Sequence, residues 1–312
     1  MQIAILEDKH RFAIEEQPVP EIGDEQVLVK VAACGVCSSE LHIWDHGGPN
    51  LPRAIGHEVS GIVERVGSEV SGVKPGDRVA VLTTKGFAEW VAVDADSCFP
   101  AGDVPLDLAL GEPLACSVNA VELADVKLGD DVVIIGAGFM GNLVEQLVWL
   151  RGPRHLIVAD TRDDALACAA SFGATRTVNV TKESLREVVH DLTDGRGADV
   201  SFEAVGTQAT LTALGEVTRM SGTVAIVGYH QGEPRALPLG HWNWMAFKIA
   251  NCHFREPATI RHGLRTGMRL LASGRINLEP VVTHRFPLSD INDAFAATRD
   301  KPPGFMKATV VM

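Results

Sequence analysis

Hydrophobic and polar residues alternate in short runs over the first third of the chain, which is the pattern of half-buried β-strands. Turn residues separate the runs at Gly23-Asp24, Gly67-Ser68 and Lys74-Pro75-Gly76-Asp77. This part is therefore expected to form a small, strongly bent sheet or barrel. Its predicted strands are Gln2–Leu6, Phe12–Glu16, Gln26–Ala33, Glu58–Val66, Arg78–Val81 and Ala88–Val93.

From Asp131 onward the pattern changes, because apolar strands alternate with helical segments. That alternation predicts an α/β fold with a doubly wound parallel sheet. Its predicted strands are Val132–Ile135, His155–Ala159, Arg176–Val180, Asp199–Glu203, Thr223–Val227 and Phe247–Phe254. The chain returns to strand at Val281–Phe286 and Lys307–Val311, so we expect a β domain from residues 1–117 and 257–312 around an α/β domain from residues 118–256.

A glycine-spaced turn follows the first α/β strand and leads into a helical pattern. Gly136 suits the turn, Gly138 lets backbone N–H groups approach a pyrophosphate, and Gly141 lets helix and strand pack closely. The next strand ends at Asp160, 19 residues after Gly141, where a carboxylate would bind a ribose hydroxyl. This order predicts dinucleotide binding. Asp160 favours NAD over NADP by repelling a 2′-phosphate, although Arg162 leaves NADP possible.

Composition narrows the class of protein. A chain of 312 residues with 46% hydrophobic and 22% charged residues suits a globular protein of about two domains. The net charge of −12 and the lack of a long basic run argue against a nucleic-acid partner. The longest apolar region, 132–150, is interrupted by glycines and polar residues, so no membrane span is expected. The N-terminus does not have the pattern of a signal peptide, and the six cysteines suggest reduced thiols or metal ligands, so we expect a cytoplasmic protein.

Three separate loops carry residues of the types that bind zinc: Cys34-Gly35-Val36-Cys37, Gly56-His57-Glu58 and Glu112-Pro113-Leu114-Ala115-Cys116. A cysteine, a histidine and a third Cys or Glu would leave one coordination position open, as a catalytic zinc requires. A structural zinc commonly uses paired short spacings, but here only one C-x-x-C is present.

At these residues the chain resembles the zinc-dependent medium-chain dehydrogenase/reductase family, which contains the alcohol and polyol dehydrogenases. The resemblance covers nearly the whole chain. It rests on Gly35–His42, Gly56-His57-Glu58, Lys74–Val79, Glu112-Pro113-Leu114, the glycine turn, Gly197–Val200 and Glu203–Gly206. It implies a GroES-like bent β-barrel catalytic domain, a Rossmann nucleotide domain and an active site between them.

The family implies zinc ligands at Cys37 and His57. The third ligand is Cys116 by alcohol-dehydrogenase spacing, whereas polyol-type relatives use Glu58 and a water held by the carboxylate that matches Glu112. Both options stay open, and the softer thiolate favours Cys116. Most relatives also carry a four-cysteine lobe for a structural zinc, but Arg78–Trp90 passes through that place without one. We therefore expect one zinc per chain.

The implied reaction is hydride transfer between a zinc-activated alcohol and a nicotinamide. Ser39 and His42 are three residues apart, so a helical turn would place both on one face, and the family uses these positions to relay a proton. Met140 is expected behind the nicotinamide and Lys307 near the cofactor phosphates. The resemblance also implies a homodimer or homotetramer through the edge strand 247–254.

The substrate is less well defined, and a sugar, polyol or other secondary alcohol is favoured because Glu58 and Glu112 resemble the polyol branch. Arg255 or Arg261 would suit a carboxylate or phosphate. Tryptophans and Phe254 are candidates for the substrate pocket: Trp44, Trp90, Trp242 and Trp244. Two alternatives remain: a zinc-free NADPH-dependent reductase of the same superfamily, and a non-catalytic NAD(H)-binding protein.

Overall fold

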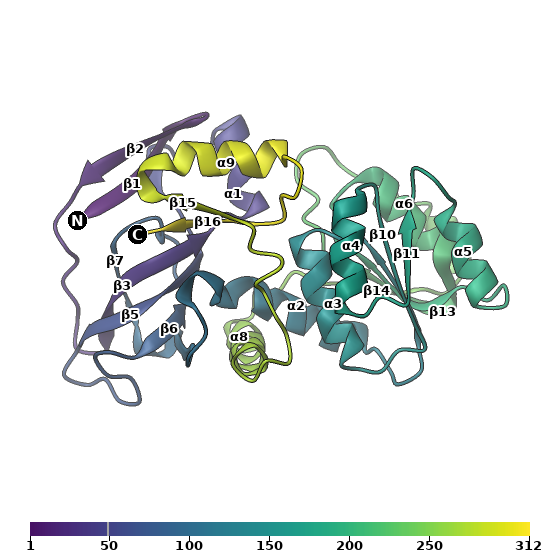
Figure 1. The fold of residues 1–312 in the computed structure, drawn as a ribbon, viewed down its shortest axis with the longest axis horizontal. Coiled ribbons are helices and arrows are strands. Elements are labelled where there is room, and N and C mark those ends of the chain that lie inside the picture. The colour runs from purple at the N-terminus through teal and green to yellow at the C-terminus, as the bar shows by residue number, and fades with distance from the viewer. Residues whose placement is uncertain (49) are drawn as a thin grey trace. The chain divides into compact units, whose positions relative to one another are not determined.

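The computed structural model describes residues 1–48 and 50–312. The chain folds into two compact units (Figure 1). The first contains Met1–Ala115 and Ile260–Met312, and the second contains Cys116–Thr259. None of the helices in the described residues combines the length and apolar character that a membrane crossing requires.

The first unit is built on two sheets. A three-stranded sheet has the order β2-β1-β4, and the larger sheet has the order β15-β16-β3-β5-β6-β8 with β7 also paired to β3. All pairings are antiparallel except β15 with β16. The elements are β1 (Gln2–Asp8), β2 (Arg11–Glu16), β3 (Gln26–Gly35), α1 (Ser38–His46), β4 (Arg53–Ala54), β5 (Glu58–Val66), β6 (Arg78–Val81), β7 (Trp90–Asp94), η1 (Ala95–Ser97), β8 (Cys98–Pro100), η2 (Leu106–Leu108), β15 (His284–Pro287), η3 (Leu288–Asp290), α9 (Ile291–Asp300) and β16 (Ala308–Val311).

Strand β3 lies at the centre of this unit, because β5, β7 and β16 all pair with it. Its apolar side chains are buried on both faces, as expected for a strand enclosed by neighbours. An aromatic group of Phe12, Trp44, Phe87 and Phe295 fills the core where α9 packs on the sheet (Figure 1). Residues near both ends of the chain therefore contribute to the core of this unit.

The second unit contains a parallel sheet with the order β11-β10-β9-β12-β13-β14. The order reverses between β9 and β12, and open α/β sheets bind ligands beside the carboxyl ends of strands at such a point. The elements are β9 (Asp131–Ile135), α3 (Phe139–Trp149), β10 (His155–Asp160), α4 (Asp163–Phe172), β11 (Arg176–Asn179), α5 (Leu185–Leu192), β12 (Ala198–Glu203), α6 (Gln208–Val217), β13 (Thr218–Ile226), α7 (Leu239–Trp244) and β14 (Lys248–Asn251).

Every residue of β9 is buried, which explains its continuous apolar sequence. Helices α3 and α4 pack together on the side of the sheet that faces the viewer in Figure 1, and α5 contacts α6. Apolar residues of α5, α6 and α7 join strand residues in one core cluster. The expected fold class, a Rossmann sheet with a GroES-like domain, is confirmed.

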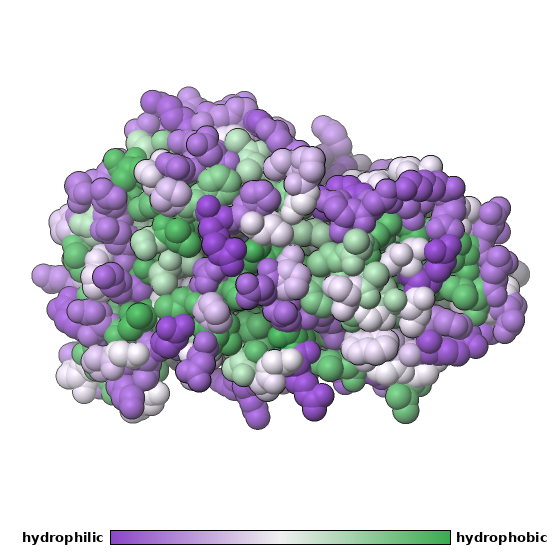
Figure 2. Space-filling model, viewed as in Figure 1, coloured by the Kyte–Doolittle hydropathy of each residue, from purple (hydrophilic) through white to green (hydrophobic). Residues whose placement is uncertain are grey.

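Two helices cross the boundaries between the units: α2 (Gly111–Ala124) and α8 (Pro257–Ala272). In α8, Leu264, Met268 and Leu271 are buried while most polar residues face outward, the amphipathic pattern of a helix on a core. Figure 2 shows hydrophobic side chains interspersed with hydrophilic ones on the visible face of each unit. Scattered exposed apolar residues of this kind are normal for a globular protein.

Candidate active site

The pairing of β3 with β5 brings the predicted ligands Cys37 and His57 together. Gly35, at the end of β3, pairs with Glu58, at the start of β5. Cys37 follows β3 as the N-cap of α1, and His57 immediately precedes β5. As a result, one ligand atom each from Cys37, His57 and Glu58 lie within 4.8 Å of one another.

Glu40 connects the two loops that carry these residues. One carboxylate oxygen accepts the backbone N–H of Cys37 at 3.4 Å, as the third helical residue does in a capping box. The other oxygen lies 2.8 Å from both the backbone N of Gly56 and Nδ1 of His57. With Nδ1–H donated to Glu40, the other ring nitrogen is the atom that would bind a metal once its proton is displaced. Sequence reasoning missed Glu40, although the spacing Cys37-x-x-Glu40 is the capping-box signal.

Glu58 forms a buried ion pair with Lys307. Nζ of Lys307 lies 2.7 Å from one oxygen of Glu58 and 2.6 Å from the other, and both side chains are almost fully buried. Lys307 reaches Glu58 because β16, which begins at the next residue, pairs with β3. Lys307 therefore neutralises part of the carboxylate charge next to His57, and its expected contact with the cofactor phosphates stays a prediction.

The electrostatics of this cluster favour a positive charge. Burial lowers the pKa of the His57 imidazole, but its hydrogen bonds with Cys37 and Glu40 outweigh that effect and raise the pKa to about 12. Thiolate, imidazole and carboxylate are the donors that zinc uses in proteins, and a carboxylate behind the histidine is the usual outer partner. The residues present therefore fit a zinc ion.

The other predicted catalytic residues lie on α1 and α2. The hydroxyl of Ser39 donates to Sγ of Cys37 at 3.3 Å, which places it beside the cluster. The half-buried His42 ring stacks on the exposed His46 ring, with 4.4 Å between centroids. Glu112 and Cys116 lie about one turn apart on α2. Their roles as zinc ligands stay predictions.

Three further cysteines and two of the tryptophans predicted for the substrate pocket are buried in the protein. Cys34, Cys98 and Cys252 are buried, and burial raises the pKa of each thiol. Trp44 and Trp242 belong to the hydrophobic cores of their units, with 3% and 1% of their surface exposed, so the structure gives both side chains a packing role.

In the second unit, the glycine turn has the backbone geometry that the sequence requires. Gly136 has φ of +105°, a conformation that favours glycine. A Cβ on Gly141 would lie 1.7 Å from the backbone oxygen of Gly136, so only glycine permits this close packing. A Cβ on Gly138 would have no neighbour within 4 Å, and Gly138, the N-cap of α3, offers no capping side chain. Space and backbone donors therefore suit a pyrophosphate.

Asp160 lies beside this turn at the end of β10. One carboxylate oxygen accepts the backbone N–H of Ala137 at 2.8 Å, and the other accepts those of Thr161 and Arg162 at 2.7 and 2.9 Å. Arg162 is the N-cap of α4 and forms an ion pair with Asp164 at 3.5 Å. Met140 is half-buried in the first turn of α3. These residues sit at the carboxyl edge of the sheet, where a dinucleotide binds in this fold.

Comparison with known proteins agrees with this geometry. Residues 23–103 match the model of the alcohol dehydrogenase GroES-like domain, and residues 140–269 match the model of zinc-binding dehydrogenases. The L-threonine 3-dehydrogenase of Anaeromyxobacter sp. (strain K) is 31% identical over 325 residues, which cover 92% of each chain. The chain belongs to the zinc-containing medium-chain alcohol dehydrogenase family. Another L-threonine 3-dehydrogenase of that family, from Burkholderia mallei (strain SAVP1), is 31% identical over 95% of this chain and 94% of its own.

Solved members of the family share the fold. Galactitol-1-phosphate dehydrogenase from Escherichia coli has a TM-score of 0.88 and 26% identity over 100% of both chains. The alcohol dehydrogenase TADH from Thermus sp. ATN1 has a TM-score of 0.86 and 26% identity over 100% of this chain and 99% of its own. The predicted class, an NAD(P)-dependent zinc dehydrogenase, is therefore confirmed.

Proposed function

We propose that this dehydrogenase oxidises the secondary alcohol of a sugar, polyol or related small molecule with NAD, using one zinc ion held by Cys37 and His57. The observation that carries the proposal is the convergence of Cys37, His57 and Glu58 within 4.8 Å. The relatives support a secondary alcohol, because L-threonine 3-dehydrogenase is named for oxidation at carbon 3, and galactitol-1-phosphate dehydrogenase is named for a sugar alcohol phosphate.

Cys116 is proposed as the third protein ligand. Lys307 engages both oxygens of Glu58, so Glu58 would have to give up part of this ion pair to bind zinc. A thiolate also suits zinc better than a carboxylate that another cation already neutralises. Glu58, with Glu112 holding a water, remains the polyol-type alternative.

When bound, zinc would supply Lewis acidity that lowers the pKa of the substrate hydroxyl, and NAD would supply the hydride acceptor. The chain's own residues hold the geometry and remove the proton. Glu40 hydrogen-bonds to the His57 ring, and Ser39, whose hydroxyl lies beside Cys37, would accept the proton of the substrate hydroxyl. Ser39 would release its own proton to His42, three residues further along α1, whose half-buried ring lies against the exposed His46 ring.

The cofactor preference rests on Asp160. Its carboxylate lies at the end of β10 beside the glycine turn, where it would bind the ribose hydroxyls of NAD and repel the 2′-phosphate of NADP. Arg162 already pairs with Asp164, which weakens its attraction for that phosphate. The proposal includes a cytoplasmic location, as expected from the reduced cysteines.

One zinc per chain and a dimeric or tetrameric assembly complete the proposal. The segment between β6 and β7 contains no cysteine, so it lacks the thiolates of a structural zinc site. At the edge of the parallel sheet, β14 pairs only with β13 within the described chain, and Ile249 is 51% exposed. Such an open edge suits pairing with the same strand of a second copy.

The decisive experiment compares Cys37→Ala with Cys168→Ala, a half-buried cysteine of the second unit. Zinc content is measured by plasma mass spectrometry, and turnover by NADH absorbance across polyols, sugars and L-threonine. Cys37→Ala should lose zinc and turnover, while Cys168→Ala keeps both. Retained turnover in Cys37→Ala would instead indicate a zinc-free reductase, and no turnover by the wild type on any secondary alcohol would favour a non-catalytic binding protein.

A further inference from the structure

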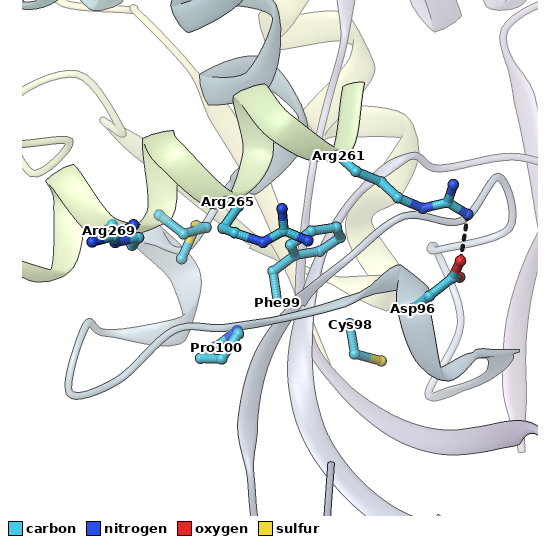
Figure 3. A pocket seen from close by; sticks show the side chains of 8 residues that line it. Asp96, Cys98, Phe99, Pro100, Arg261, Arg265 and Arg269 are labelled. Carbon is cyan, nitrogen blue, oxygen red and sulfur yellow. Dashed lines mark ion pairs between the residues drawn. The ribbon is translucent and has the colours of Figure 1, made fainter. Parts of the chain in front are cut away.

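A pocket of about 390 Å³ lies in the first unit, between α8 and β8. Its lining includes Arg261, Arg265 and Arg269 from α8 and Cys98, Phe99 and Pro100 from β8, on opposite sides in Figure 3. Small-molecule sites in proteins have volumes of about 300–1,000 Å³. This arginine pocket shares no residue with the Cys37, His57 and Glu58 cluster.

The three arginines repeat at every fourth position of α8, so they follow one side of the helix. Four residues rise about 6 Å along a helix, which lets two neighbouring guanidinium groups reach one anion. The helix carries no Asp or Glu. This concentration of positive charge is unusual in a chain whose 40 acidic residues outnumber its 28 Lys and Arg.

The arginines differ in whether an acid already neutralises them. Arg261 forms an ion pair with Asp96 at 2.7 Å (Figure 3), and Asp96 is the acid that lines the pocket. Arg265 and Arg269 are exposed and have no ion pair within the described chain. The guanidinium groups of Arg265 and Arg269 therefore lie at one end of the pocket, and the ion pair between Arg261 and Asp96 lies at the other (Figure 3).

The floor of the pocket is apolar. Its apolar lining includes the exposed ring of Pro100 and the almost fully buried side chains of Phe99 and Met268. Cys98 adds an uncharged thiol, because burial and the nearby charge of Asp96 raise its pKa to about 12. A bare inorganic anion would use the arginines and leave this floor without a contact, whereas a molecule with an apolar body would cover it.

We propose that the arginine pocket binds an organic anion, with a carboxylate or phosphate group held by Arg265 and Arg269 and an apolar body on the floor. The guanidinium groups donate paired hydrogen bonds to the anion, and Asp96 fixes the head group at the other end by repulsion. The ligand thus belongs to a site separate from the zinc cluster, and its binding does not depend on which alcohol the enzyme oxidises.

The test uses the full chain labelled with [methyl-13C]methionine, because the buried methyl of Met268 reports occupancy of this pocket and can be assigned with Met268→Leu. The probes are octanoate and octyl phosphate, with octanamide as the uncharged analogue. At millimolar concentration at least one anion should produce a saturable shift of the Met268 resonance, and octanamide should produce none. The two anions distinguish a carboxylate ligand from a phosphate ligand.

The double variant Arg265→Gln/Arg269→Gln should weaken this binding by about tenfold or more, since it removes charge-assisted hydrogen bonds. The matched control Arg186→Gln changes an exposed arginine on α5 and should bind like the wild type. Asp96→Asn should bind more tightly, because it removes the repelling acid and releases Arg261. An unshifted Met268 resonance, equal shifts with octanamide, unchanged affinity in the double variant, or weaker binding by Asp96→Asn would each overturn the proposal.

Discussion

Two buried carboxylates, Asp131 in the second unit and Glu58 in the first, have very different surroundings. Asp131, which is fully buried, pairs with Arg154 at 2.5 Å, Arg196 at 2.8 Å and His155 at 2.9 Å. Glu58 forms an ion pair with Lys307 and lies beside two further groups that could bind a metal, Cys37 and His57. Asp131 therefore lies between two arginines and a histidine, whereas Glu58 belongs to a cluster of side chains whose sulfur, nitrogen and oxygen atoms could bind a metal ion.

This difference separates a structural network from a functional one. Asp131 begins β9 at the amino edge of the parallel sheet, opposite the edge where the glycine turn follows the same strand. These partners hold the start of the strand in place, and they occupy both carboxylate oxygens of Asp131. Around His57, Glu40 holds the ring while the donor atoms face one another, an arrangement that stabilises an added cation. Burial of a carboxylate alone therefore does not indicate function. What distinguishes the two sites is whether the carboxylate is surrounded by cations or by other groups that could bind a metal.

Asp131→Asn should lower the free energy of unfolding by about 2–4 kcal/mol, because two arginines and His155 lose a buried carboxylate partner. Burial raises the pKa of Asp131, but the hydrogen bonds from Arg154 and His155 outweigh it, so the pKa is lowered. This stabilisation is present above the unfolded pKa of 3.8 and is lost as the pH falls below it. Calorimetric unfolding should thus show less acid sensitivity in the variant.

The exposed Asp191→Asn on α5 is the control and should leave the unfolding midpoint unchanged. If Asp131→Asn is as stable as this control, the Asp131 network does not stabilise the sheet. The structural role that we assign to Asp131 in the comparison with Glu58 would then be wrong. Zinc content and the NAD affinity of folded Asp131→Asn should equal those of the wild type, because the network lies at the opposite edge of the sheet from the glycine turn.

Glu145 on α3 extends the comparison to a buried carboxyl group that forms no ion pair with the described residues. It is fully buried, and within the described chain its oxygens have no hydrogen-bond partner of normal geometry. Burial raises its pKa to about 8, with a partly offsetting contribution from the backbone of Ala174. The folded protein therefore keeps this proton after the unfolded chain has released it near pH 4.5, and stability falls by at most about 1.4 kcal/mol per pH unit between these values.

Glu145→Gln should remove this pH dependence. The free energy of unfolding of the variant, relative to that of the wild type, should therefore increase from about pH 5 to about pH 8 and then level off. Calorimetric unfolding midpoints at several pH values measure it, with the exposed Glu216→Gln on α6 as control. A constant difference between variant and wild type across this range would show that Glu145 ionises in the folded protein as it does in the unfolded chain.

Glu40→Gln examines the functional network itself. Loss of the carboxylate behind a ligand histidine typically weakens metal affinity 10–100-fold, and a comparable loss is expected here. Competition with a fluorescent zinc chelator measures the affinity, and Glu64→Gln, an exposed residue of β5, is the control. Equal zinc affinity in the two variants would mean that Glu40 only caps α1 and does not position His57.

The sequence was sufficient for the parallel sheet and for the family, because both depend on local patterns. The buried run 131–135, the glycine turn and the residues around Cys37 and His57 are each readable within a few positions. Contacts between distant positions were not readable: Glu40 meets His57 across 17 residues, and Lys307 meets Glu58 across 249. The strand predicted from Thr223 begins at Thr218, because Thr218 pairs with Ala198 before Ser221, whose φ is +57°, interrupts the pattern.

The smallest effect is expected for cofactor preference on substitution of Asp160. Two substitutions can separate the effect of its charge from the effect of its hydrogen bonds. Asp160→Asn keeps an oxygen that can accept the Ala137 N–H but removes the charge, so the ratio of kcat/KM for NAD over NADP should fall about tenfold, or ~1.4 kcal/mol. Asp160→Ala also loses the contact with the turn and should weaken both cofactors in addition to changing the ratio. Steady-state kinetics with each cofactor measure both quantities, and Asp191→Ala serves as the control. An unchanged ratio in Asp160→Asn would assign Asp160 to the turn alone, and would place it with Asp131 among the carboxylates that hold the sheet.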